Sequence, residues 1–91
     1  MNKLDKMRTI IDSIDSEIIK LLKKRFDVSS DIWLYKKELG YNHFDSKRES
    51  EIVEKIKLKV DDSILENHIV KIYENILIES KAYQCEKDGE K

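Results

Sequence analysis

The sequence contains no proline, and its only glycines are Gly40 and Gly89. These two residue types most often interrupt regular structure, so a chain with so few of them favours long helices. Cys85 is the single cysteine, which excludes an intrachain disulfide framework and a thiolate metal cluster. We interpret it as a bystander near the end of a helix. A chain of 91 residues predicts one domain.

Neither charge nor hydropathy is strongly biased. The 18 Lys and Arg residues nearly cancel the 19 Asp and Glu residues, and a net charge of -1 does not indicate nucleic acid or an anionic membrane as a partner. No apolar run approaches the ~20 residues of a membrane span, and the start MNKLDKMRTI has no apolar signal-peptide core. We expect a cytoplasmic helical domain at residues 1–85 and a polar, disordered tail at residues 86–91.

The first predicted helix is unusually long. Apolar residues recur every three or four positions from Leu4 to Leu39, and Gly40 follows as a stop. Thirty-six residues span roughly 54 Å as a helix, whereas a compact domain of this size has a radius of gyration near ~13 Å. Two shorter helices cannot cover such a length, so we expect an intertwined homodimer. The alternative is a bent or broken first helix in a monomeric bundle, which the unbroken spacing disfavours.

Two shorter helices are expected in the remainder of the chain. Residues 41–44 form a short loop, and Ser46 with Glu49 has the spacing of a capping box that opens a second helix. Ser63 and Glu66 repeat that spacing at the start of a third helix. The expected fold is therefore all-α, with a three-helix protomer.

Arg25 interrupts the apolar series of the first helix. A buried unpaired charge costs several kcal/mol, so its guanidinium needs an anion as partner. Lys36 follows eleven residues later, within ~20° around the helix axis and ~16 Å along it. Two such cations converging on one pocket suit a ligand with more than one carboxylate. The structural alternatives are a buried ion pair that fixes helix register for Arg25 and a solvated lysine for Lys36.

Polar residues also interrupt the other helices. Ser80 and Gln84 continue an apolar stripe of the third helix, and Asp45, Arg48 and Glu49 share one side of the second helix start. Each residue alone admits an ordinary role as a satisfied core group, a cap or a surface side chain. Together they favour one polar pocket that all three helices line.

These residues also form an ordered set. Residues 8–25 read RTIIDSIDSEIIKLLKKR, Lys36 follows, Asp45–Glu49 reads DSKRE, and Ser80 precedes Gln84 by four positions. Over residues 4–84 the chain resembles the all-helical chorismate mutase family. The resemblance implies an intertwined homodimer that converts chorismate to prephenate by a [3,3] rearrangement in phenylalanine and tyrosine biosynthesis, without a cofactor or metal.

The resemblance also implies roles for single residues. Arg25 and Arg8 of the partner subunit would bind the two substrate carboxylates, with help from Ser80. Lys36 and Gln84 would hydrogen-bond the ether oxygen of the breaking bond. Glu49 would hold the ring hydroxyl, beside Asp45 and Arg48. Helix geometry agrees for Arg8, which lies ~25 Å along the axis from Arg25 and ~100° around it, too far to share a site in one straight helix.

Three other functions are compatible with parts of the pattern. An isochorismate pyruvate lyase would use a similar fold and cationic pocket, but the lyases lack the Asp45–Glu49 helix start. A catalytically silent dimerisation module would not need the full set of polar residues, whereas a subunit that a partner enzyme activates is compatible with it. A plain coiled-coil adaptor explains the apolar series but not Arg25 and Lys36 on one face.

Overall fold

The computed structural model describes residues 2–42 and 45–89. Helix α1 spans Lys3–Glu38, α2 spans Ser46–Lys59 and α3 spans Ser63–Gly89, with no strand in the described ranges. The predicted all-α, three-helix fold is thus confirmed. The first helix is shifted by one residue from the expected bounds, and of the expected loop at residues 41–44, residues 43 and 44 lie outside the described part.

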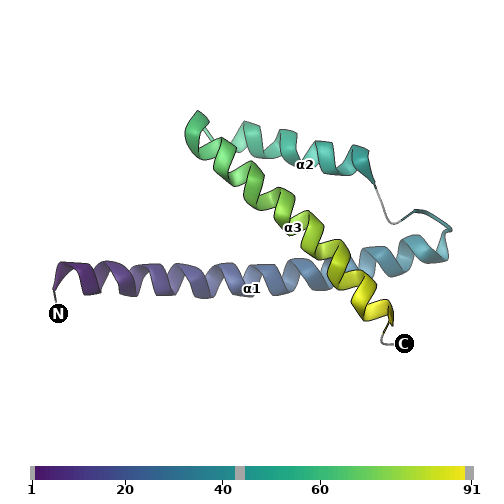
Figure 1. Ribbon diagram of the computed structural model, residues 1–91, viewed down its shortest axis with the longest axis horizontal. Helices are drawn as coiled ribbons and strands as arrows, with labels where there is room; N and C mark the ends of the chain where they lie inside the picture. The colour runs from purple at the N-terminus through teal and green to yellow at the C-terminus, as the bar shows by residue number, and fades with distance from the viewer. Residues whose placement is uncertain (1, 43–44, 90–91) are drawn as a thin grey trace.

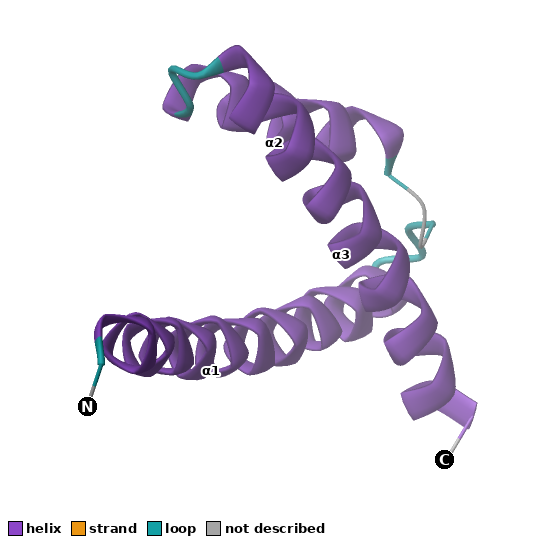
Figure 2. Cartoon of the chain, turned by 60° about the vertical axis from the view of Figure 1, so that its left-hand side comes forward, coloured by secondary structure: helices purple, strands orange, loops and turns teal. Residues whose placement is uncertain are grey.

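The three helices form an open arrangement (Figures 1 and 2). Helix α3 packs against both α2 and the C-terminal half of α1, whereas the N-terminal half of α1 extends away from the other two helices. The Cα radius of gyration is 16.7 Å and the longest dimension is 56 Å. Because α1 is one uninterrupted helix of 36 residues, the alternative of a broken first helix is wrong.

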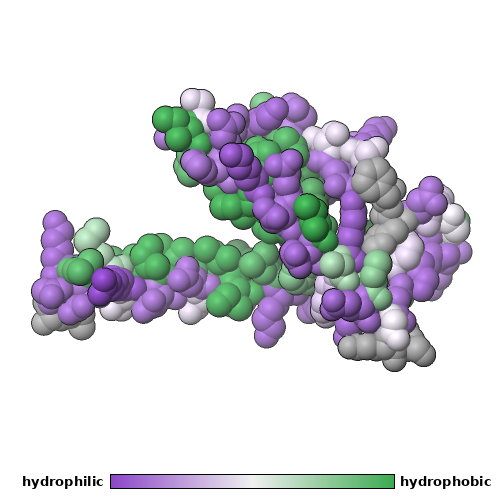
Figure 3. Space-filling view, in the orientation of Figure 1, coloured by the Kyte–Doolittle hydropathy of each residue, from purple (hydrophilic) through white to green (hydrophobic). Residues whose placement is uncertain are grey.

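Most of the apolar series on α1 is uncovered in the protomer. Exposed fractions are between 47% and 60% for the side chains of its N-terminal half, namely Leu4, Met7, Ile11, Ile14, Ile18 and Leu21. Figure 3 shows the resulting apolar band along the part of α1 that extends beyond α3. Among the described residues, Ile56 is the single buried hydrophobic side chain. One protomer therefore buries too little apolar surface to form a core of ordinary size.

Both expected capping boxes are wrong by one position. The Asp45 carboxylate caps α2 and accepts a hydrogen bond from the Arg48 backbone N–H at 3.0 Å. Asp62 likewise accepts from the backbone N–H groups of Ile64 and Leu65 at 2.9 and 3.2 Å. In each case an aspartate precedes the expected serine, and its negative charge also interacts favourably with the positive end of the helix dipole.

Helix α1 ends in a Schellman motif around Gly40. Gly40 has φ +75°, its N–H donates to the Lys37 carbonyl at 3.1 Å, and the Tyr41 N–H donates to the Lys36 carbonyl at 2.8 Å. Glycine adopts this left-handed conformation without the steric cost that a Cβ imposes. The motif fixes where the chain leaves α1, within one turn of Lys36.

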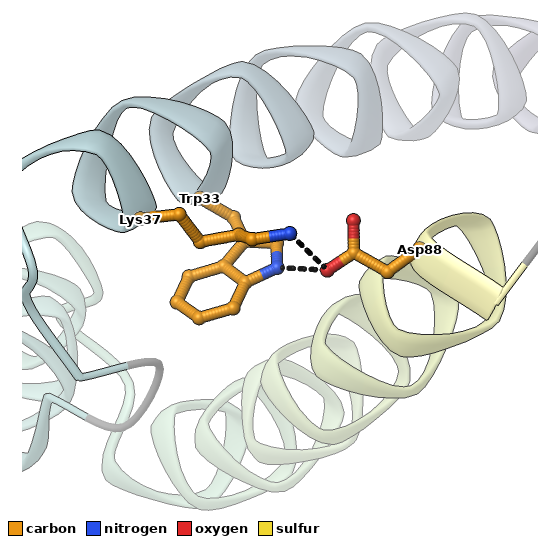
Figure 4. A network of polar contacts seen from close by, with 3 residues as sticks. All are labelled: Trp33, Lys37 and Asp88. Atoms are coloured by element: carbon orange, nitrogen blue, oxygen red, sulfur yellow. Dashed lines mark hydrogen bonds and ion pairs between the residues drawn. The ribbon is translucent and has the colours of Figure 1, made fainter. Parts of the chain in front are cut away.

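Polar and aromatic contacts hold the C-terminal part of α3 against α1. The Trp33 indole donates to Asp88 Oδ2 at 2.7 Å, and Lys37 Nζ lies 3.3 Å from the same oxygen (Figure 4). Earlier along both helices, the rings of Phe26 and Tyr83 stack with centroids 5.5 Å apart. The expected disordered tail is therefore wrong for residues 86–89, which are helical; residues 90 and 91 lie outside the described part.

No helix within the described ranges combines the length and apolar composition that a bilayer-crossing segment needs.

Replacing Gly40 by alanine should destabilise the protein by about 1 kcal/mol, because a Cβ at positive φ costs roughly 1–2 kcal/mol and the smaller unfolded-state entropy offsets only part of it. No heavy atom lies within 4 Å of an added Cβ at Gly40 or at Gly89, and Gly89 lacks the positive φ. Gly89→Ala is thus a matched control. Urea denaturation checks the difference, and equal effects of the two substitutions would contradict the strain argument.

Replacing Asp88 by alanine should destabilise the protein by about 1 kcal/mol, because the Trp33 indole and the Lys37 ammonium group lose a shared, partly exposed acceptor. The last turn of α3 should then fray, and the emission of Trp33, the single tryptophan, should shift. Glu86→Ala, at an exposed position two residues earlier, is the control. Thermal unfolding and tryptophan fluorescence check this, and identical behaviour of the two variants would contradict a fixing role for Asp88.

Candidate active site

A cavity of about 330 Å³ lies where the three helices converge. The C-terminal half of α1, the first turns of α2 and the C-terminal half of α3 each contribute side chains to it. Its wall combines polar and charged groups with apolar and aromatic ones: Arg25, Ser29, Ile32, Trp33, Lys36, Asp45, Arg48, Glu49, Ile52, Leu77, Ser80, Lys81 and Gln84.

Seven of the eight predicted site residues line this cavity, namely Arg25, Lys36, Asp45, Arg48, Glu49, Ser80 and Gln84. The eighth, Arg8, lies on the extended N-terminal half of α1, away from the cavity of its own chain. The structure therefore brings together the residues that the sequence spacing grouped, while the role of each remains a prediction.

Arg25 and Lys36 are both half-buried on the cavity side of α1. The Arg25 guanidinium lies 6.0 Å from the centroid of the Tyr73 ring, a cation–π contact. Within residues 2–42 and 45–89, neither Arg25 nor Lys36 forms an ion pair with a carboxylate. The protomer thus offers no support for a structural ion pair at Arg25, and both cations are available to an anionic ligand.

Two polar residues of α3 are the most buried groups in the cavity wall. Ser80 is 5% exposed and Gln84 is 7% exposed. The buried Ser80 hydroxyl has no hydrogen-bond partner in the described part of the chain. Because buried polar atoms are nearly always hydrogen-bonded, a ligand is a natural partner for this hydroxyl.

The start of α2 supplies charges of both signs. Asp45 is occupied as the helix cap, and Arg48 forms a 3.6 Å ion pair with Glu51 in which both side chains are exposed. Such a pair contributes little and leaves Arg48 able to turn toward a ligand. Glu49 instead forms a 2.6 Å ion pair with Lys81 of α3.

The side chains of the cavity wall that sequence analysis did not identify include Trp33 and Lys81. Lys81 directly follows Ser80, but a lysine beside an apolar helix stripe usually lies in solvent. Its pairing with Glu49, 32 residues away in the sequence, is a property of the fold that no local spacing indicates. Trp33 lies one position from Ile32 on α1, and it is not one of the apolar residues whose spacing predicted this helix.

The cavity carries an excess of positive charge. Four cationic side chains, those of Arg25, Lys36, Arg48 and Lys81, face two carboxylates, those of Asp45 and Glu49. The formal excess of two positive charges, counted for one chain, favours an anionic ligand. Ile32, Ile52 and Leu77 add apolar surface to the wall, and electrostatic interactions are stronger beside apolar surface than in open water.

Comparison with known proteins agrees with this arrangement. Residues 7–85 match the family described as chorismate mutase type II. The chain is 34% identical over 85 residues to the chorismate mutase of Methanocaldococcus jannaschii, covering 92% of this chain and 86% of that protein.

Two solved structures of chorismate mutase from Thermus thermophilus have similar folds. Form II has a TM-score of 0.86 at 25% identity, with 91% of this chain and 94% of that chain covered. Form I has a TM-score of 0.82 at 26% identity, with 87% and 99% covered. The family match and the fold similarity both extend over most of the sequence, and the chain belongs to the chorismate mutase type II family.

Proposed function

We propose that the cavity binds chorismate and holds it while it rearranges to prephenate. Membership of the chorismate mutase family makes the protein an isomerase of aromatic amino acid biosynthesis. The observation that supports this cavity as the site is the cationic pair of Arg25 and Lys36, which no carboxylate of the described chain neutralises. A cytoplasmic location, expected from composition, remains a prediction.

Binding of the two carboxylates is assigned to Arg25 and to Arg8 of the partner subunit. A guanidinium presents two parallel N–H donors to a carboxylate and keeps its charge at any physiological pH. The Ser80 hydroxyl would donate to the same carboxylate as Arg25, which would satisfy a buried group that otherwise lacks a partner.

The chemistry requires no nucleophile, because the substrate rearranges within itself. The protein accelerates such a step by holding the compact conformer in which the two reacting carbons approach each other. It also stabilises the negative charge that develops on the ether oxygen as the carbon–oxygen bond breaks. Lys36 and Gln84 are the donors assigned to that oxygen. An amide donates at any pH, so Gln84 should not impose an acidic optimum.

The hydroxyl end of the substrate would lie against the start of α2. Glu49 would accept a hydrogen bond from the ring hydroxyl, with Asp45 and Arg48 beside it. The α2 cap and the Schellman motif of α1 fix the two ends of the connection between these helices. Glu49 and Lys36, which follow and precede this connection, both line the cavity.

The substrate site also requires a second copy of the chain. The apolar band of α1 is exposed in the protomer. Fully burying each of its large side chains contributes about 1.5–3 kcal/mol to the free energy of folding and association. A second α1 provides a band of the same kind, which favours an isologous homodimer. In that intertwined dimer, Arg8 would enter the partner's cavity, which it cannot do in its own chain.

Removing either cavity cation should lower activity, and the two substitutions should differ in whether KM changes together with kcat. Arg25→Ala should raise KM and lower kcat, whereas Lys36→Ala should lower kcat by about 10²–10³ because it removes a charge that acts on the transition state. Both variants should remain folded. Chorismate consumption at neutral pH, with chromatographic identification of prephenate, checks this.

Lys23→Ala is the control for those variants, since Lys23 is exposed and lies on the opposite face of α1 from Arg25. An unchanged kcat in Lys36→Ala would remove Lys36 from the mechanism. Formation of pyruvate from isochorismate, without prephenate from chorismate, would identify a lyase instead.

Mixing two inactive variants should restore activity if Arg8 acts in the partner's site. In a mixed dimer of Arg8→Ala and Lys36→Ala chains, one cavity carries both substitutions and the other carries neither. Random pairing after joint refolding should therefore recover about a quarter of the wild-type rate. Sedimentation should give twice the 10.8 kDa chain mass. A monomer mass, or no recovered activity in proven mixed dimers, would contradict the assignment.

A further inference from the structure

The ion pair between Lys81 and Glu49 is unlike the surface pairs of this protein. Lys81 Nζ lies 2.6 Å from Glu49 Oε2 and joins α3 to α2, while the Arg48–Glu51 pair measures 3.6 Å within one helix. The side chains of Lys81 and Glu49 are 34% and 28% exposed, against 55% and 50% for Arg48 and Glu51. The Lys81–Glu49 pair is thus shorter and better shielded, and both of its members line the cavity.

Glu49 alone poses an electrostatic difficulty for the proposed substrate. Its carboxylate lines the same cavity that must accept two substrate carboxylates, and like charges at short range repel strongly where water is partly excluded. A flexible glutamate at the first turn of α2 also has several rotamers, of which only some direct an oxygen toward the ligand. A cation held at one carboxylate oxygen addresses both problems.

We propose that Lys81 is a positioning residue that fixes Glu49 through Oε2 and leaves Oε1 to accept the ring hydroxyl of the substrate. This inference rests on the proposed function. Lys81 also neutralises the charge of Glu49. Without Lys81, an uncompensated carboxylate would face the substrate.

The inference predicts a specific pattern in the kinetics. The hydroxyl contact is present in both the bound substrate and the transition state, so its loss should raise KM and leave kcat nearly unchanged. Lys81→Met, which keeps the length of the stem, should raise KM about tenfold, and Lys81→Arg should largely restore it. Lys71→Met, at an exposed position on the same helix, should match the wild type.

A double-mutant cycle tests whether Lys81 acts through Glu49. Wild type, Lys81→Met, Glu49→Gln and the double variant would be compared by kcat and KM for chorismate, and by calorimetric affinity for prephenate, which carries the same hydroxyl and both carboxylates. The Lys81→Met substitution should cost about tenfold in the wild-type background and less than about threefold in the Glu49→Gln background. A role in joining α2 to α3 alone would lower thermal stability without this coupling in KM.

The outcomes separate this inference from the proposed function. Active wild-type protein with equal costs of Lys81→Met in both backgrounds would overturn the inference and leave the mutase function standing. A fall in kcat with unchanged KM would also overturn it, since it would place Lys81 at the reacting bond. Wild-type protein that binds prephenate with the predicted coupling but does not convert chorismate would support the inference and overturn the function. Protein that neither binds nor converts would overturn both.

Discussion

The length of α1 relative to the other helices is the constraint on which the rest of the structure depends. One uninterrupted helix of 36 residues cannot be covered by the two shorter helices, because only α3 packs against it, along its C-terminal half. That half carries the cavity, and the free half carries an apolar band and Arg8. A single helix thereby separates a region that lines the cavity from a region whose apolar side chains are exposed in the protomer.

Charge balance inside the cavity is the second organising feature. A site for a dianion must hold several cations close together, and unneutralised cations repel each other before the ligand arrives. This chain limits that repulsion by distributing the cations over three helices and by pairing one of them, Lys81, with Glu49. Arg25 is also placed against the face of the Tyr73 ring, which stabilises a cation without neutralising it.

Much of this arrangement could be predicted from sequence because helices place residues at fixed intervals. The spacing of Arg25 and Lys36, and of Ser80 and Gln84, correctly put each pair on one helix face. Features that depend on contacts between helices were missed. Residues 86–89 are helical although their composition is that of a frayed end, and the Trp33–Asp88 hydrogen bond joins this last turn to α1. The position of Lys81 beside Glu49 depends on how α3 packs against α2, which the spacing within one helix does not indicate. The caps were misplaced for a local reason: an aspartate stood directly before each expected serine.

The scarcity of buried apolar side chains in one protomer has a consequence for how the proposed enzyme responds to its own concentration. A monomer in which Ile56 is the single buried hydrophobic side chain of the described residues has little stability of its own. In the proposed dimer, folding, association and assembly of both cavities would then share one equilibrium. Dilution would then dissociate the dimer and unfold its chains. Substrate that binds only the assembled dimer would shift the equilibrium back toward that dimer by mass action.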